Sequence, residues 1–270
     1  MSGRRVLPPV AEAYRPAETI ALPARGWRIA PRHALLAGGL CWLGFVVFAW
    51  LVLSGRSLSF DAAGLRFWRT GPDLHPRGPA WLLENVRDFT ALGGVLLRNL
   101  VAIGAMVALL FMRLRREALL LAGTIIGGWI VDSLLKAAVG RPRPALVSHL
   151  AEAGGASFPS GHSFNSAVVY IAIGLGFAAM SPRPSVRRTI VASAVVVSLL
   201  VALSRVWLGV HFPSDVAAGW CGGAGWAFLA SALLYPTAKT AAEENAAQLE
   251  AVTPGELGRP QPRSSHARSR

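Results

Sequence analysis

The sequence predicts an all-α, polytopic membrane protein with a bundle of six transmembrane helices, and three observations carry this prediction. Hydrophobic residues make up 53% of the 270 residues and charged residues only 15%, whereas roughly a quarter of a soluble domain is charged. The mean hydropathy is +0.45. Several apolar runs reach about 20 residues, the helix length that crosses a bilayer core. Because only helices and closed barrels satisfy their backbone in lipid, these runs indicate helices.

Six apolar runs define the predicted spans in chain order. They cover residues 34–53, 92–112, 118–139, 162–180, 189–203 and 216–235. Polar or helix-breaking turns end three of them, namely Gly55-Arg56, Arg113-Leu114-Arg115-Arg116 and Ser181-Pro182-Arg183-Pro184. The last span carries a set of small residues that allows close helix packing. This set is Gly219, Gly222, Gly223 and Gly225.

The segments outside the spans are more polar. Residues 1–32 are rich in Pro and Arg, and residues 236–270 are Ala- and Glu-rich and then Pro-, Arg- and Ser-rich. Both are predicted to be mostly disordered tails around one membrane domain at residues 33–235. The loop at residues 56–90 mixes Trp with Arg, which suits either a segment at the lipid interface or an ordinary ordered loop. Within it, residues 82–88 form a predicted short helix.

Charged residues inside two of the spans also need an explanation. Arg98 lies near one end of the second span, where it either reaches toward the headgroup region or helps to hold an anionic headgroup. In the third span, Asp132 and Lys136 are one helical turn apart, so they share a face and can pair.

The positions of arginine predict the orientation in the membrane. Arginines cluster in both tails and in the turns after the second and fourth spans, and positive charge is enriched on the cytoplasmic side. Both termini are therefore predicted to be cytoplasmic, and the loops after the third and fifth spans to face outward. Arg141 and Arg143 oppose this rule. A role in phosphate binding explains Arg143, whereas Arg141 has no explanation from the sequence.

The net charge of +13 raises the question of nucleic-acid binding. Because the arginines lie in tails and in turns between apolar runs, where positive charge sets topology, we expect no nucleic-acid partner. The expected partners are the bilayer and an anionic lipid headgroup.

Three polar clusters fall at the predicted outward ends of the spans, which places them together in one site. They are Lys136-x6-Arg143-Pro144, Pro159-Ser160-Gly161-His162 and Ser204-Arg205-x5-His211-x3-Asp215. Lys136, Arg143 and Arg205 would repel one another unless a compact polyanion lay between them. The planar fork of Arg fits phosphate oxygens, and Lys adds a point charge. A phosphate group is therefore the predicted occupant.

The second and third clusters supply the remaining chemistry. Ser160 suits an N-cap and Gly161 lets the backbone approach a ligand, so this helix start is a candidate phosphate seat. Asp215 follows His211 by four residues, and a carboxylate fixes the imidazole tautomer and raises the basicity of its far nitrogen. His211 is then the candidate nucleophile and His162 the candidate general acid. A metal site on these histidines is the alternative, which the three cations oppose.

Together the three motifs resemble the signature of the type 2 phosphatidic acid phosphatase and vanadium haloperoxidase superfamily, over about residues 88–235. The resemblance implies a six-helix core, an outward-facing site, and a phosphatase that uses no metal and no cofactor. It implies that His211 forms a phosphohistidine, that Asp215 orients it and that His162 acts as acid. The implied phosphate-binding residues are Lys136, Arg143, Ser160, Gly161 and Arg205.

The expected function is hydrolysis of a lipid phosphomonoester or diphosphate at the outer face of a bacterial inner membrane. Phosphatidate, phosphatidylglycerophosphate, undecaprenyl diphosphate and lipid A would all present the same phosphoryl group to this site. Two alternatives stay open. One is a catalytically silent protein that binds lipid phosphate, and the other is a vanadate-dependent haloperoxidase.

Overall fold

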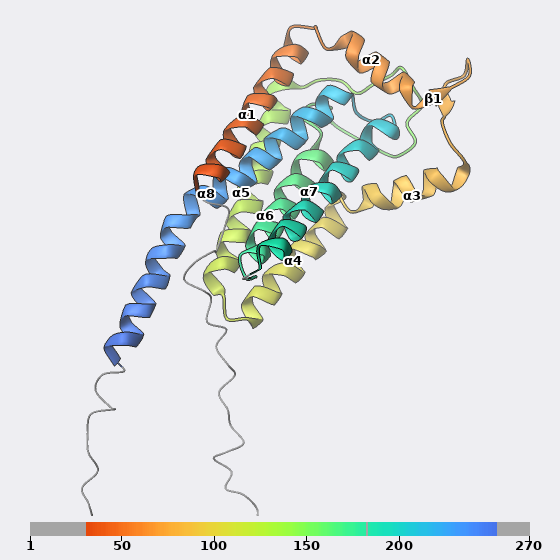
Figure 1. The fold of residues 1–270 in the computed structure, drawn as a ribbon. Coiled ribbons are helices and arrows are strands. Elements are labelled where there is room, and N and C mark those ends of the chain that lie inside the picture. The colour runs from red at the N-terminus through yellow and green to blue at the C-terminus, as the bar shows by residue number, and fades with distance from the viewer. Residues whose placement is uncertain (1–30, 182, 253–270) are drawn as a thin grey trace, which may run out of the picture.

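The computed structural model describes residues 31–181 and 183–252, and this part of the chain is mostly helical (Figure 1). Of the tails predicted at residues 1–32 and 236–270, residues 1–30 and 253–270 lie outside it. The helices are α1 (Pro31–Leu53), α2 (Leu58–Phe67), α3 (Ala80–Ala91), α4 (Val95–Phe111), α5 (Arg115–Val139), α6 (Gly161–Ala178), α7 (Pro184–Trp207) and α8 (Pro213–Val252). Two short antiparallel strands, β1 (Arg69–Thr70) and β2 (His75–Pro76), pair in the register Arg69↔Pro76.

The long helices form a bundle with α6 at its centre, where α6 contacts α4, α5, α7 and α8. Phe164, Ala167 and Ile171 of α6 are fully buried. Helix α1 packs along α8 at one edge (Figure 1). The sequence explains why α6 can be the buried central helix. Its first half combines Ser and Asn with apolar residues, and these polar side chains find partners on neighbouring helices, as Asn165 does with Asp132.

Helices occur at all six predicted span positions, as α1, α4, α5, α6, α7 and α8. In the described part of the chain, four helices are long and apolar enough to cross a membrane: α1, α5, α7 and the first part of α8. The bent pair α3 and α4, which meet at 49°, would make a fifth. Helix α6 has 18 residues but begins with Gly161, His162 and Ser163, and this polar start lowers its hydropathy.

The final helix is longer than the sequence predicted. Helix α8 continues past Tyr235 to Val252, although residues from 236 onward are assigned from sequence to a mostly disordered tail. The added segment is rich in Ala and Glu, which have high helix propensity. It continues a helix that is already nucleated, so no new nucleation cost arises.

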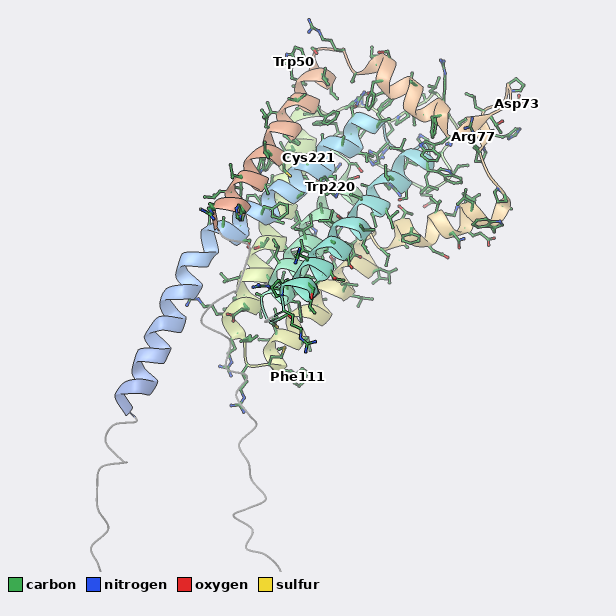
Figure 2. The ribbon with its side chains drawn as sticks, viewed as in Figure 1. Trp50, Asp73, Arg77, Phe111, Trp220 and Cys221 are labelled. Carbon is green, nitrogen blue, oxygen red and sulfur yellow. The ribbon has the colours of Figure 1, made fainter. Side chains whose placement is uncertain are left out.

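Side chains on the outside of the bundle are largely apolar, as lipid-facing surfaces are. Leu36, Leu40 and Leu43 of α1 are all more than half exposed, a pattern that a soluble monomer rarely shows over a continuous surface. Figure 2 shows Trp50 and Phe111 at opposite ends of the bundle, both on its outside. Trp220 lies among the helices and donates from Nε1 to the Ser198 hydroxyl at 3.0 Å. These exposures support a membrane-embedded bundle.

The predicted glycine face of α8 lets two neighbouring helices approach closely. A Cβ atom on Gly222 would lie 2.8 Å from the Phe164 ring, and one on Gly223 would overlap the Phe164 carbonyl oxygen. On another side of α8, a Cβ on Gly225 would lie 2.8 Å from the Trp42 ring of α1. The prediction of a small-residue face is therefore confirmed for Gly219, Gly222 and Gly223, which approach the start of α6, whereas Gly225 faces α1.

Replacing Gly223 with alanine is expected to destabilise the bundle by about 1–3 kcal/mol or more, because a backbone carbonyl cannot move aside as a side chain can. Thermal unfolding in detergent measures the effect. Gly176→Ala on α6 is the matched control, since a Cβ there meets nothing within 4 Å and alanine is the better helix former. Equal melting temperatures for the two variants would contradict the packing argument.

The loop at residues 56–90 folds into a layer across one end of the bundle. It contains α2, the β1–β2 hairpin and α3, and α3 leads from the hairpin back to the side of the bundle, where it packs against α7 before the chain bends into α4 (Figure 1). Helix α3 includes the predicted short helix at residues 82–88. The turns α4–α5 and α6–α7 lie at the opposite end of the bundle (Figure 1). The two arginine-rich turns therefore share one end, and the three polar clusters meet at the other.

Candidate active site

The first polar cluster follows the end of α5. Gly140, in the left-handed conformation (φ 59°), ends the helix, and the chain then carries Arg141 and Arg143 across the end of the bundle. Four hydrogen bonds position Arg143: its guanidinium donates to the carbonyl oxygens of Gly154 (2.6 Å), Gly155 (3.1 Å) and Val210 (2.8 Å), and to His211 Nε2 (3.0 Å). Four of its five N–H groups are therefore engaged.

Within α5, Lys136 directs its ammonium group to the Pro159 carbonyl oxygen. Asp132 accepts from Asn165 Nδ2 at 2.9 Å. Among the ion pairs of the described residues, Asp132 and Lys136 do not form one, so the pairing that their spacing allows is not realised in this structure. Lys136 lies instead at the start of α6, where a Cβ on Gly161 would lie 3.2 Å from Lys136 Cε.

The second cluster forms the start of α6. Ser160 is the N-cap, as predicted: its backbone is extended, and its hydroxyl accepts from Ser163 N at 3.5 Å and from Ser163 Oγ at 2.9 Å. The Ser160 N–H donates to the Asp215 carbonyl oxygen at 3.0 Å, which ties the starts of α6 and α8 together. A helix start of this kind presents backbone N–H groups to an anion.

The third cluster spans the connection between α7 and α8. Arg205, 3% exposed, donates from Nη1 to Thr90 Oγ1 of α3 at 2.9 Å. Gly209 has a φ of +75°, and a Cβ there would lie 2.6 Å from Arg69 Nη2, so glycine is required on both counts. The connection places His211 beside the first turn of α8, where Asp215 Oδ2 accepts from Phe212 N at 3.1 Å.

The tautomer of His211 follows from its neighbours. Since a guanidinium only donates, the 3.0 Å contact from Arg143 Nη1 makes His211 Nε2 an unprotonated acceptor, whose lone pair receives this hydrogen bond. The proton is then on Nδ1, which faces Asp215 Oδ2 at 3.6 Å and Ser157 Oγ at 3.3 Å. The Ser157 hydroxyl donates to the same Asp215 oxygen. The unprotonated nitrogen of the imidazole, Nε2, is therefore directed at the Arg143 guanidinium.

His162 lies in the first turn of α6 and packs against the bend between α3 and α4. A Cβ on Gly93 would lie 3.2 Å from its ring. His162 interacts electrostatically with Arg205, His211, Arg98 and Arg143, and Lys136 with Arg143 and Asp215. The structure thus brings together all eight site residues that the sequence predicts.

Burial lowers the pKa of His211 to about 4, and Arg143 adds to the shift while Asp215 opposes it. An unfolded chain has this histidine near 6.5, so as pH falls from 6.5 toward 4 the unfolded state takes up the proton first. The free energy of unfolding is expected to fall by about 3 kcal/mol across that window, and His211 adds no pH dependence above it. Thermal melts of the wild type and His211→Gln from pH 4 to 8 measure the difference, and parallel curves would contradict it.

Several polar residues near the site were not predicted from the sequence. Arg141 Nη1 donates to Asp215 Oδ1 at 2.5 Å, and its Nη2 to Asp61 Oδ2 at 2.7 Å. Ser157 and Thr90 contact Asp215 and Arg205, as described above. The only available signal was Arg141, an arginine on the side of the membrane that disfavours positive charge. Asp61 is one of four acidic residues in the loop at residues 56–90, so the sequence did not single it out.

The structure argues against one of the two predicted roles of Arg98, reaching toward the headgroup region, while a contribution to holding an anionic headgroup stays a prediction. Arg98 is 4% exposed, so it does not extend to the membrane surface. Its Nη1 donates to the Gly93 carbonyl oxygen at 2.9 Å, at the bend between α3 and α4. Tyr170 similarly donates to the Leu92 carbonyl oxygen at 2.7 Å. These two side chains satisfy carbonyl groups beside the bend, next to His162.

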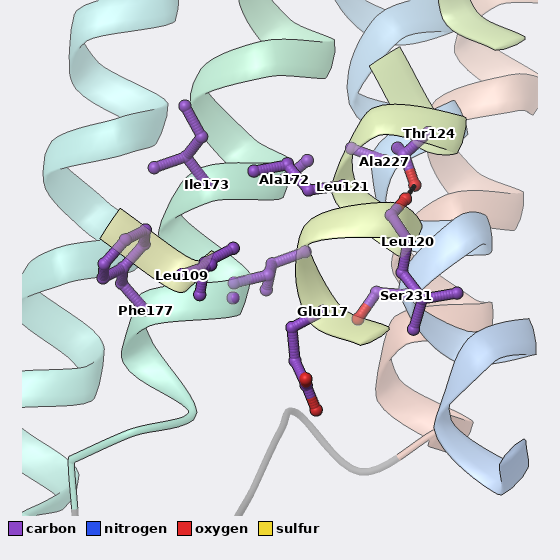
Figure 3. A pocket seen from close by; sticks show the side chains of 12 residues that line it. Leu109, Glu117, Leu120, Leu121, Thr124, Ala172, Ile173, Phe177, Ala227 and Ser231 are labelled. Carbon is purple, nitrogen blue, oxygen red and sulfur yellow. Dashed lines mark hydrogen bonds between the residues drawn. The ribbon is translucent and has the colours of Figure 1, made fainter. Parts of the chain in front are cut away.

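A separate pocket lies between α4, α5, α6 and α8, away from these residues (Figure 3). Its walls are mainly apolar and include Leu109, Leu121 and Phe177, with Glu117 at its edge. Glu117 belongs to the first turn of α5, at the end of the bundle opposite the three clusters. The pocket contributes no group to the candidate active site.

The chain resembles a known protein family over the region that contains the eight predicted site residues. The model of the PAP2 superfamily matches residues 117–238. Phosphatidylglycerophosphatase B of Bacillus subtilis (strain 168) is 37% identical over 142 residues, which cover 52% of this chain and 68% of that protein. The chain belongs to the PAP2 superfamily.

Other members of the PAP2 superfamily support the same assignment. A lipid A 1-phosphatase of Rhizobium etli is 35% identical over 121 residues, 42% of this chain and 47% of that protein. The crystal structure of a transmembrane PAP2-type phosphatidylglycerolphosphate phosphatase from Bacillus subtilis has a TM-score of 0.66 and 28% identity, covering 73% of this chain and 94% of that one. This chain is therefore a membrane phosphatase of the PAP2 superfamily.

Proposed function

We propose that this protein hydrolyses a phosphomonoester or diphosphate of a membrane lipid at the extracytoplasmic face, through a phosphohistidine on His211. The observation that carries the proposal is the unprotonated Nε2 of His211, which accepts from Arg143 and has Asp215 on the far side of the ring. A phosphate group entering between Arg143 and His211 would accept the hydrogen bond that the guanidinium now donates to Nε2. This exchange would release the Nε2 lone pair and place the phosphorus beside it. The substrate class is consistent with the lipid phosphatases among its relatives.

In the first step, His211 Nε2 attacks phosphorus and forms a P–N bond while the P–O bond to the lipid breaks. The leaving oxygen takes a proton from His162, and the imidazole becomes cationic beside Asp215. Lys136, Arg143 and Arg205 neutralise the phosphoryl oxygens, and N–H groups at the start of α6 add further hydrogen bonds. These groups act where charge develops, so they stabilise the transition state more than the ground state.

In the second step, water attacks phosphorus and the P–N bond breaks. His162, now neutral, accepts the proton from water, and inorganic phosphate leaves. His211 returns to its neutral form with the proton on Nδ1. The three phosphate-binding cations perform the charge stabilisation that a metal ion would otherwise supply, so we expect no metal requirement.

Orientation and location are part of the proposal. The two arginine-rich turns share one end of the bundle and the active-site clusters share the other (Figure 1). With positive charge on the cytoplasmic side, this arrangement supports six spans, cytoplasmic tails and an active site that faces the periplasm or exterior. The membrane domain covers residues 33–235, and the bacterial inner membrane is the proposed location.

Phosphate release by the purified protein tests this function. We expect turnover of at least one of phosphatidate, phosphatidylglycerophosphate, undecaprenyl diphosphate and lipid A phosphate, with the rate unchanged by EDTA. Binding without turnover across this panel would contradict the proposal and favour a silent lipid-phosphate-binding protein. Halide oxidation that depends on added vanadate would favour the haloperoxidase alternative. Loss of turnover in EDTA would contradict the metal-free mechanism.

A further inference from the structure

A buried carboxylate from outside the matched family region lies behind the active site. Asp61 belongs to α2, is fully buried, and lies well before residue 117, where the match begins. It accepts from Arg141 Nη2 at 2.7 Å, from Ser214 N at 2.9 Å and from Ser214 Oγ at 2.8 Å. Three donors thus hold a charge that burial alone would disfavour.

Arg141 connects this carboxylate to the one behind His211. Its Nη1 donates to Asp215 Oδ1 at 2.5 Å, its side chain is 11% exposed, and the Phe212 ring lies 4.1 Å from its guanidinium carbon. The second Asp215 oxygen faces His211 Nδ1 and Ser157. An unbroken line of contacts therefore runs from Asp61 through Arg141 and Asp215 to His211.

The charges along this line matter for the reaction. Attack by His211 places positive charge on the imidazole, and a negative Asp215 stabilises that charge. Arg141 alone, 2.5 Å from Asp215, would cancel most of the field of that carboxylate at the ring. Asp61 offsets the charge of Arg141, so the group of two carboxylates and one guanidinium keeps a net negative charge facing His211.

Helix α2 is held firmly enough to keep Asp61 in this place. A Cβ on Gly64 would overlap the Pro213 ring, so α2 rests directly on the first turn of α8. The Ser214 contacts of Asp61 also cap α8 from a distant segment, since Ser214 N is one of the unpaired donors at that helix start. The loop at residues 56–90 therefore contributes directly to the catalytic end of the bundle.

We propose that Asp61 is a positioning residue of the phosphatase, whose negative charge offsets Arg141 and leaves the charge of Asp215 available to the imidazolium that forms at His211. Arg141 holds Asp215 in place, and Asp61 supplies the charge that makes this bridge compatible with nucleophilic attack. This inference rests on the phosphohistidine route proposed above.

Asp61→Asn tests the role of charge, because asparagine has the same shape and caps helices as well as aspartate does. We expect kcat for a lipid phosphate to fall by about tenfold, since roughly one pKa unit of stabilisation of the cationic imidazole is lost. KM should stay unchanged, because Asp61 makes its side-chain hydrogen bonds to Arg141 and Ser214 and to none of the proposed phosphate-binding residues. The rate of phosphohistidine formation, measured by rapid quench, should fall in parallel with kcat.

Ser214→Ala is the matched control, because it removes hydrogen bonds to Asp61 and Arg141 without removing a charge. Its kcat should fall much less than that of Asp61→Asn. If Asp61→Asn melts far below the wild type, the smaller and equally neutral Asp61→Ser provides the same test. Equal kcat values for Asp61→Asn and Ser214→Ala, or a change confined to KM, would overturn the inference. Activity retained by His211→Ala would instead overturn the proposed function, so the two failures are distinguishable.

Discussion

Alanine in place of His211 is expected to lower kcat by at least about a thousandfold, the size of loss that removing a catalytic nucleophile causes. The variant keeps its phosphate-binding cations, so KM for a lipid phosphate should change little. No phosphohistidine should form in this variant. Among the described residues, only His211 has an imidazole whose Nε2 accepts from Arg143 and whose Nδ1 faces Asp215. Phosphate release and trapping with radiolabelled lipid phosphate measure both effects.

His75→Ala is the matched control for that experiment. His75 belongs to β2, in the layer over the same end of the bundle, and its side chain is 73% exposed. We expect full activity from this variant. If His211→Ala retained turnover, or if labelled phosphate remained attached to it, His211 would not be the nucleophile.

Alanine in place of His162 should give the second large effect, a loss of about a hundredfold to ten-thousandfold in kcat for a lipid phosphate. An alkyl leaving oxygen needs the proton that His162 supplies. An aryl phosphate leaves without that proton, so the variant should form the phosphohistidine from p-nitrophenyl phosphate at close to the normal rate. Breakdown of the intermediate still needs a base to activate water, and labelled protein should therefore accumulate.

The leaving group is the internal control for this prediction. His162→Ala should be impaired much more in phosphohistidine formation from a lipid phosphate than from the aryl phosphate. Equal losses with both substrates would contradict the role of general acid. They would point instead to a packing role of His162 against Gly93 at the bend between α3 and α4.

The sequence predicted the helical architecture because its signals are local. Runs of apolar residues, prolines and arginine-rich turns predicted six helices, which correspond to α1 and α4–α8 in the structure. Their ends were less well predicted. Helix α7 begins at Pro184 and ends at Trp207, beyond the predicted 189–203 on both sides. Helix ends depend on capping and on partners in neighbouring segments, and hydropathy carries little information about either.

The eight predicted site residues were identifiable for a different reason. Each belongs to a short motif whose residue types have few other uses in a membrane, such as His211 four residues before Asp215. Charged groups at membrane depth cost free energy and are therefore rare unless they serve a function, so their presence alone was informative. The spacing within each motif also fixed which groups could share a helix end.

The contacts among these groups were decided only by the tertiary structure. Asp61 and Ser214 are separated by 153 positions, and Thr90 and Arg205 by 115. No periodicity or spacing links residues that far apart, because such pairs form only when loops close and helices pack. The sequence thus identified the groups that we propose carry the chemistry. The fold decided that Arg141 joins two buried carboxylates, and so how much negative charge faces His211.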